Sequence, residues 1–248
     1  MASNPNHQTV HLNNRGVAYL EKGHLHKSFN LFRDALRSTM NQLRDTTAQE
    51  AAQPTPSSSS AAEGTKLWRV KGMKAFANSK APSNRRVLGP SDFMFSQGVT
   101  LMEEAGAYSS NHMVDVTVRS SIVLFNLALI HHIKGLTESN SKYLIKAESF
   151  YIRSHKLLVD TGLELGRCGN PVIDFVSMAL LNNAAQVGRE LCHSELSQQQ
   201  FRQLMQIATQ INAASYGESS IAQFMEETKN DFLLNAIVLC DQSRAAAA

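Results

Sequence analysis

The chain has 248 residues, of which 43% are hydrophobic and 18% are charged, and its formal net charge is +3. This length can bury one large core or two small ones. The ordinary content of charged residues gives no surface coat of charge of the kind that marks a nucleic-acid carrier, and so mild a net charge says little about partners by itself. Three cysteines without a C-x-x-C pair are too few for a disulfide framework and favour a reducing compartment, so we expect a cytoplasmic or nuclear protein.

The first 44 residues predict two helices. An apolar stripe at helical spacing begins at Val10, the turn "EKGHLH" follows around Gly23, and the stripe resumes at Phe29. The polar start of the chain predicts no secretory signal. We take residues 9–44 as a first helix pair.

Residues 45–91 predict a disordered basic linker. The stretch 46–65 is rich in Ser, Ala, Thr and Pro and has nothing apolar to bury, and residues 66–86 carry seven Lys or Arg residues and no acid. This arm could bind phosphates and stack Trp68 on a base or act as a nuclear-import signal, and a solvated, extended linker is the simplest reading. Its candidate nucleic-acid contacts are Lys66, Trp68, Arg69, Lys71, Lys74, Arg85 and Arg86.

Residues 92–118 predict irregular structure that folds back on the helices. The short apolar stretch "DFMFSQGVTLM" (92–102) could form a strand beside "MVDVTVR" (113–119), in which valines alternate with other residues. A short β-hairpin is therefore compatible with this part of the insertion.

From residue 119 onward the pattern is helical. The longest apolar stretch, 121–130, has about half the length of a membrane-spanning helix, so no membrane contact is expected. Some apolar side chains left over from the helical stripes, Val123, Leu127, Ile130 and Met178, could serve self-association. Helices are expected near 119–136, 142–162, 171–191, 196–213 and 218–241.

The helix pairs repeat one pattern of small and aromatic residues. Two stretches more than a hundred residues apart share five positions in step: Asn14, Gly16, Ser28, Phe32 and Ala35 in the first, and Asn183, Ala185, Ser197, Phe201 and Leu204 in the second. Another pair matches on each helix, with Asn126 and Ala128 on the first and Ala147, Tyr151 and Ser154 on the second. Its connection, "GLTESNSKY", is seven residues longer than in the other pairs.

This order of residues resembles the tetratricopeptide (TPR) motif over residues 9–38 and 119–241. The resemblance implies an all-α fold, a TPR-like α-solenoid of antiparallel helix pairs in which each pair contacts its neighbours. The asparagines are 112, 57 and 52 residues apart, from Asn14 through Asn126 and Asn183 to Asn235, where the TPR family keeps close to 34. We therefore expect insertions within the solenoid. We also expect the last helix, which ends near residue 241, to have no partner helix and to cap the stack.

The resemblance also places Asn14, Asn126 and Asn183 on first helices, which line the concave face of a TPR stack. An amide side chain carries both a donor and an acceptor, so each asparagine could bind the N–H and C=O of an extended peptide together. Alternatively, each amide bonds a neighbouring helix and only spaces the stack, a role that Asn235 on the cap fits better. We expect Asn126→Ala with Asn183→Ala to weaken peptide capture and leave thermal stability nearly intact if the first role holds.

Other residue patterns give little reason to expect chemistry. Histidines gather at His24/His26 and His131/His132, but no carboxylate or cysteine stands at ligand spacing beside them, so no metal site is expected. No nucleotide loop, nucleophile elbow or H-E-x-x-H pair occurs, and no catalytic residue or cofactor is expected.

These observations predict a protein–protein interaction module that binds a peptide or protein partner in its groove. The alternative is a nucleic-acid-associated regulator that uses the basic segment 66–86, with the helical body for docking or dimerisation.

Overall fold

The computed structural model describes residues 5–52, 94–101, 112–160, 162, 165–216 and 219–245, and in these residues it contains helices and no strand. The predicted all-α class is confirmed. Its helices are α1 (Pro5–Glu21), α2 (Leu25–Ala52), α3 (His112–Thr137), α4 (Ser141–Asp160), α5 (Pro171–Glu190), α6 (Ser194–Gln210), the short 3-10 helix η4 (Ala213–Tyr216) and α7 (Ser219–Ala245).

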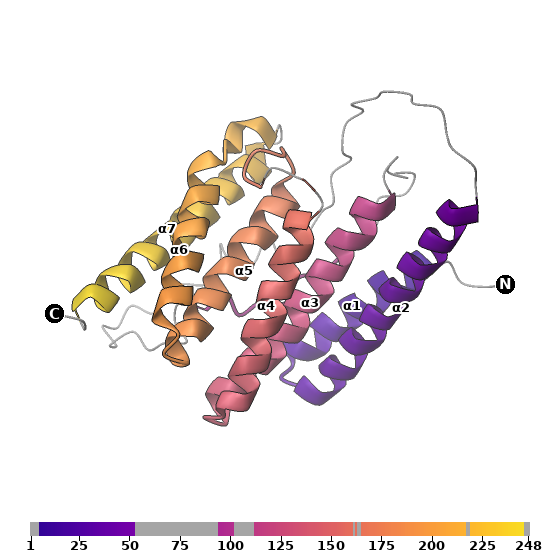
Figure 1. Ribbon diagram of the computed structural model, residues 1–248, viewed down its shortest axis with the longest axis horizontal. Helices are drawn as coiled ribbons and strands as arrows, with labels where there is room; N and C mark the ends of the chain where they lie inside the picture. The colour runs from indigo at the N-terminus through magenta and orange to yellow at the C-terminus, as the bar shows by residue number, and fades with distance from the viewer. Residues whose placement is uncertain are drawn as a thin grey trace.

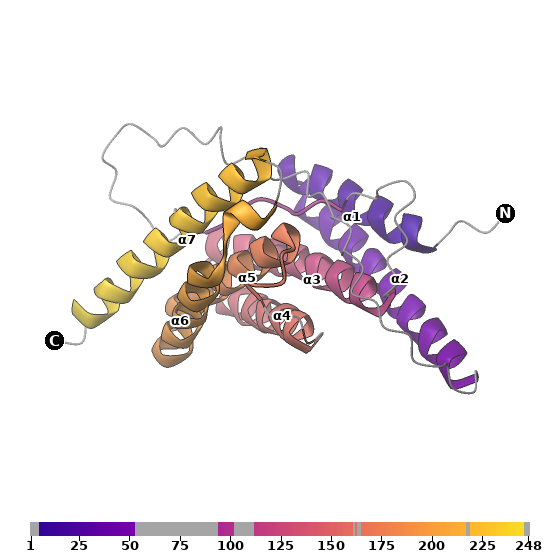
Figure 2. The same cartoon turned by 90° about the horizontal axis from the view of Figure 1, so that it is seen from above.

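Each helix packs against the next one in the chain, from the α1–α2 pair at one end of the molecule to α7 at the other (Figure 1). The odd-numbered helices also contact one another, α1 with α3, α3 with α5 and α5 with α7. The odd-numbered helices therefore form one neighbouring series, and residues 94–101 cross it as an extended segment between α7 and α1 (Figure 2).

The same two backbone hydrogen bonds close the turns α1–α2, α3–α4 and α5–α6. In each turn a residue with positive φ donates its N–H to the carbonyl three residues earlier, and the following residue donates to the carbonyl five residues before it. This is the Schellman arrangement, which satisfies the last carbonyls of the first helix and reverses the chain. The three residues with positive φ are Gly23 (74°), Ser139 (49°) and Cys192 (60°).

The seven additional residues of the second pair lie in helices. The turn residue follows the matched asparagine by 9 residues in the first and third pairs and by 13 in the second, so α3 has four more residues before its turn. The other three lie at the start of α4, before Ala147. The longer connection inferred from the sequence is thus an extension of both helices, with about one helical turn added at the end of α3 and about one at the start of α4.

Small residues let the paired helices approach closely. A Cβ on Gly16 of α1 would lie 2.5 Å from the ring of Phe32 in α2, so only glycine fits there. The Ser28 hydroxyl donates to the Gly16 carbonyl at 2.8 Å, and the Ser197 hydroxyl donates to the Ala185 carbonyl at 2.7 Å. The same hydrogen bond thus joins α1 to α2 and α5 to α6.

Two features of the predicted insertion are wrong. The strand expected at 113–119 is part of α3, whose valines Val116 and Val118 are both buried. A helix buried on most sides is apolar at nearly every position, so its alternating residues imitate a strand. The linker expected from residue 45 is helical as far as Ala52, because its Ala, Gln and Glu residues favour helix. Residues 53–91 of that linker lie outside the described residues.

Helix α3 is the centre of the core. Its residues Val114–Thr137 are long and apolar enough to cross a membrane by composition, but 89% of the most apolar window is buried inside the protein. The apolar residues considered for self-association are buried in α3 and α5 and are therefore not available to a second copy of the chain. These residues, each at most 3% exposed, are Val123, Leu127, Ile130 and Met178.

Candidate peptide-binding site

Three asparagines on consecutive odd-numbered helices hold the extended segment 94–101. Asn183 of α5 accepts the N–H of Phe95 at 2.9 Å and donates to the carbonyl of the same residue at 2.9 Å. Asn126 of α3 does the same with Val99, at 2.8 Å for both bonds. Each side-chain amide thus pairs with the backbone of one residue as a neighbouring β-strand would.

Asn14 of α1 makes the third pair of this kind. Its Oδ1 accepts the N–H of Leu101 at 2.7 Å, and its Nδ2 donates to the Leu101 carbonyl at 2.5 Å. The structure therefore brings the three asparagines singled out in the sequence onto one extended segment. The segment belongs to the chain itself, and binding of a partner's peptide stays a prediction.

The register of the three pairs follows from extended geometry. The bound residues 95, 99 and 101 are all odd-numbered, and an extended chain repeats its orientation every two residues. The segment runs from α5 through α3 to α1, against the order of the helices in the sequence. We call this face, formed by Asn14, Asn126 and Asn183, the amide ladder.

A second row of asparagines supports the ladder, and the sequence reasoning missed it. Asn13 donates to the Val99 carbonyl at 3.0 Å and accepts the Nδ2 of Asn126 at 2.9 Å. In the same way Asn182 accepts the Nδ2 of Asn235 at 3.3 Å. The doubled "NN" at 13–14 and 182–183 is the signal that could have revealed this row.

Two amides of the ladder and its neighbour Asn13 are removed from water, whereas Asn14 is partly buried. Asn126, Asn183 and Asn13 are each 0% exposed, and a buried polar group without a partner costs about 1–3 kcal/mol. Asn183 also donates to the hydroxyl of Tyr151 at 3.2 Å, where burial raises the pKa of the phenol far above its usual range. The ladder is therefore neutral, and at Asn126 and Asn183 its hydrogen bonds are shielded from water.

An aromatic pocket holds the side chain of Phe95. Its ring centroid lies 5.9 Å from Phe125 of α3, 5.4 Å from Phe175 of α5 and 6.3 Å from Phe232 of α7, and the Phe175 and Phe232 contacts are edge-on. Such pairs add about 0.5–1.5 kcal/mol beyond burial. Three odd-numbered helices thus build one pocket beside the amide ladder.

His131 and His132 pack as side chains of the core, whereas His24 and His26 are exposed. His131 stacks against the rings of Tyr143 and Phe150, at centroid distances of 5.8 and 5.6 Å. Burial, helped by Lys146 and Lys134, lowers its pKa to about 4, and burial alone lowers the pKa of His132 to about 3. Within the described part of the chain no group of three His, Cys, Asp or Glu side chains could hold a metal ion.

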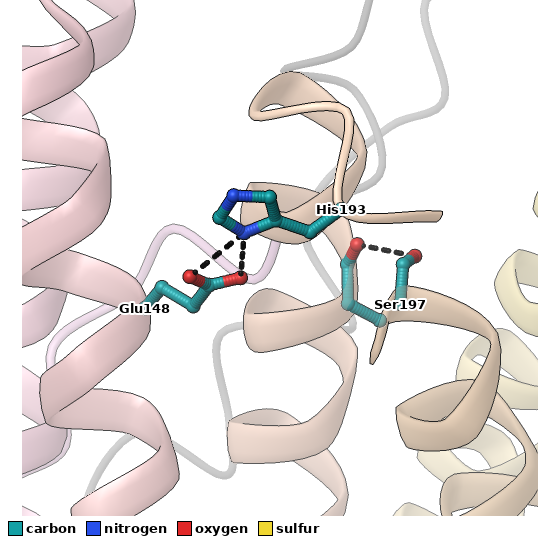
Figure 3. A network of polar contacts seen from close by, with 4 residues as sticks. Glu148, His193 and Ser197 are labelled. Atoms are coloured by element: carbon teal, nitrogen blue, oxygen red, sulfur yellow. Dashed lines mark hydrogen bonds and ion pairs between the residues drawn. The ribbon is translucent and has the colours of Figure 1, made fainter. Parts of the chain in front are cut away.

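Figure 3 shows a polar cluster at the turn between α5 and α6. His193 contacts both carboxylate oxygens of the buried Glu148 at 3.2 Å, while Ser197 donates to the Ala185 carbonyl. Because the serine hydroxyl points to a backbone carbonyl and the histidine points to Glu148, these residues do not form a nucleophile–base pair. They tie α4 to the α5–α6 pair.

The candidate nucleic-acid segment 66–86 lies outside the residues that the structure describes. No protein-family model, curated protein or solved structure matches this chain.

Proposed function

We propose that this chain is a protein–protein interaction module, a TPR-like α-solenoid that binds an extended peptide of a partner along the amide ladder. The observation that carries the proposal is the set of three asparagines that each bind both backbone groups of one residue in an extended segment.

The repeated local contacts support the TPR-like part of the proposal. Three turns share one hydrogen-bond pattern, and two helix pairs share a serine bond to the carbonyl twelve residues earlier. Units that repeat such contacts and touch mainly their neighbours are characteristic of solenoid proteins. The first helix of each unit would then contribute one asparagine to a common inner face.

The chemistry of the ladder supports peptide binding. Hydrogen bonds to backbone N–H and C=O groups do not depend on the side chains of the bound residues, so any extended peptide could make them. Sequence preference would come from adjacent pockets such as the one around Phe95. This division of affinity and specificity is that of β-strand addition, with side-chain amides in place of a sheet edge.

Panning of a displayed library of eight-residue peptides tests this function. The target is the chain with Val99→Ala, which weakens the hold on the chain's own segment and leaves every ladder residue in place. We expect sequences to be enriched on this target and to be lost when Asn126→Ala and Asn183→Ala are added. Asn212→Ala, at an exposed residue after α6, is the matched control and should retain them. Equal enrichment with and without the two ladder asparagines would refute the proposed groove.

A further inference from the structure

We propose that residues 94–101 are an internal pseudoligand, and that the partner is an extended peptide of the form F-x-x-G-V-x-L, which binds by displacing them. This inference rests on the proposed function and gives it a partner chemistry. In this pattern Phe95 is position one, Gly98 position four, Val99 position five and Leu101 position seven.

Position one requires an aromatic ring. Phe95 is 5% exposed and touches the rings of Phe125, Phe175 and Phe232. A smaller side chain would leave a cavity among three phenylalanines, and cavities in such a setting are costly.

Position four favours glycine. A Cβ on Gly98 would lie 3.0 and 3.1 Å from the two γ-methyl groups of Val17 and 3.2 Å from a methyl of Leu20, both in α1. These distances are shorter than ordinary contacts, and a branched side chain would extend further into α1. Glycine at this position therefore lets the bound peptide approach α1 without displacing Val17 and Leu20, and so keep the amide pairs on either side.

Positions five and seven require apolar side chains, since Val99 is 1% and Leu101 2% exposed. The other three positions are exposed to different degrees: Ser96 is exposed, and Gln97 and Thr100 are partly buried. Ser96, the exposed one of the three, should tolerate substitution most readily. The site therefore recognises the residues at four of the seven positions.

The contacts that hold the segment can be made equally by a peptide in trans. The amide pairs are bonds to backbone groups and the Phe95 ring makes apolar contacts, and neither kind depends on a covalent connection to the helices. Without an occupant, the buried amides of Asn126 and Asn183 and the aromatic pocket would be exposed together. Exchange of one occupant for another is therefore favoured over an empty groove.

The covalent link makes the internal segment a competitor. Fifty-nine residues connect Ala52 to His112, and the eight-residue segment is part of them. A tethered ligand can act as if present at roughly millimolar concentration, so a partner peptide binds only if its affinity or local concentration exceeds this threshold. The segment thus sets the threshold for partner binding.

Fluorescence anisotropy with a labelled, capped peptide MFSQGVTL tests the inference on the full-length chain. We expect the Val99→Ala chain to bind this peptide at least tenfold more tightly than the wild-type chain does. Leu101→Ala is a second chain variant, used if the first does not fold as judged by circular dichroism. A peptide with Gly→Val at its glycine should bind at least tenfold more weakly, and the matched peptide with Ser→Ala should bind like the original.

The outcomes separate this inference from the proposed function. Equal, measurable affinity of wild-type and Val99→Ala chains would overturn the pseudoligand and leave peptide binding standing. Undiminished binding of the Gly→Val peptide would overturn the sequence pattern. A wild-type dimer that dissociates when peptide is added would identify a second copy as the occupant and overturn an external partner. Absence of binding by both folded chains would overturn the proposed function as well.

Discussion

Asn126→Ala tests how much of the stability depends on the amide ladder. Asn126 makes three hydrogen bonds, two with the backbone of Val99 and one with Oδ1 of Asn13, and it is 0% exposed. The truncation leaves the Val99 carbonyl paired with Asn13, but it removes the partners of the Val99 N–H and of Oδ1 of Asn13. At about 1–3 kcal/mol for each buried group that loses its partner, we expect a loss of about 2–6 kcal/mol.

Urea unfolding followed by circular dichroism measures this loss, with Asn14→Ala and Asn212→Ala as comparisons. Asn14 is only partly buried, so water can replace its amide and the loss should be about 1 kcal/mol. Asn212 is exposed and should change stability by less than about 0.5 kcal/mol. Equal, small losses at Asn126 and Asn14 would refute the reasoning, because they would mean that the bonds to Val99 contribute nothing.

Two further predictions concern the turns and the buried histidines. Cys192 has a φ of 60° in the turn between α5 and α6, so Cys192→Gly should relieve strain and raise stability by about 1 kcal/mol; a lower melting temperature in differential scanning calorimetry would contradict this. His131 and His132 are 7% and 1% exposed with pKa values lowered to about 4 and 3, so the unfolded chain binds their protons first as the pH falls. Stability should decrease below pH 6.5, by up to about 1.4 kcal/mol per pH unit for each histidine until its folded pKa is reached. His131→Phe keeps the ring stack and should reduce that slope by about 1.4 kcal/mol per pH unit between pH 6 and 4.5, measured by urea unfolding at several pH values; an unchanged slope would refute the assignment.

The structure changes one expectation about the ladder. The sequence suggested that Asn126→Ala with Asn183→Ala would leave thermal stability nearly intact, because it placed these amides on an open groove. The groove is filled by residues 94–101, and both amides are buried beneath it. Loss of stability and loss of peptide binding should therefore occur together, which is why the binding tests above compare variants of the segment as well as variants of the ladder.

The helices and the ladder positions were predictable because they depend on local pattern. Apolar stripes located the helix pairs, and equal offsets from Asn14 and Asn183 aligned two of them. The occupant of the groove was not predictable in this way, because its contacts with Asn14 and Asn183 join residues 87 and 88 positions apart. The local pattern of "DFMFSQGVTLM" is the same for a β-strand that pairs with another strand and for an extended segment that pairs with side-chain amides.

The two asparagine rows explain why the residue recurs despite its poor helix propensity. A helix interior normally disfavours Asn because its amide competes with the backbone, yet here each amide is committed to a partner outside its own helix. Asn13 and Asn182 hold the amides of the next odd-numbered helix, Asn126 and Asn235, while Asn14, Asn126 and Asn183 face the segment.

In the proposed groove, affinity and specificity would come from different side chains. The amides bind backbone groups that every peptide carries, so their loss should weaken all extended ligands by a similar factor. The ring pocket around Phe95 and the close approach of Val17 to Gly98 depend on sequence, so changes there should alter the order in which peptides bind. A purely structural role for the segment would require both sets of contacts for folding and would leave no variant that binds one peptide better and another worse. A change in the pocket that leaves the ladder intact should therefore reverse the order of preference between two peptides if the face is a binding groove. It should not do so if the segment has only a structural role.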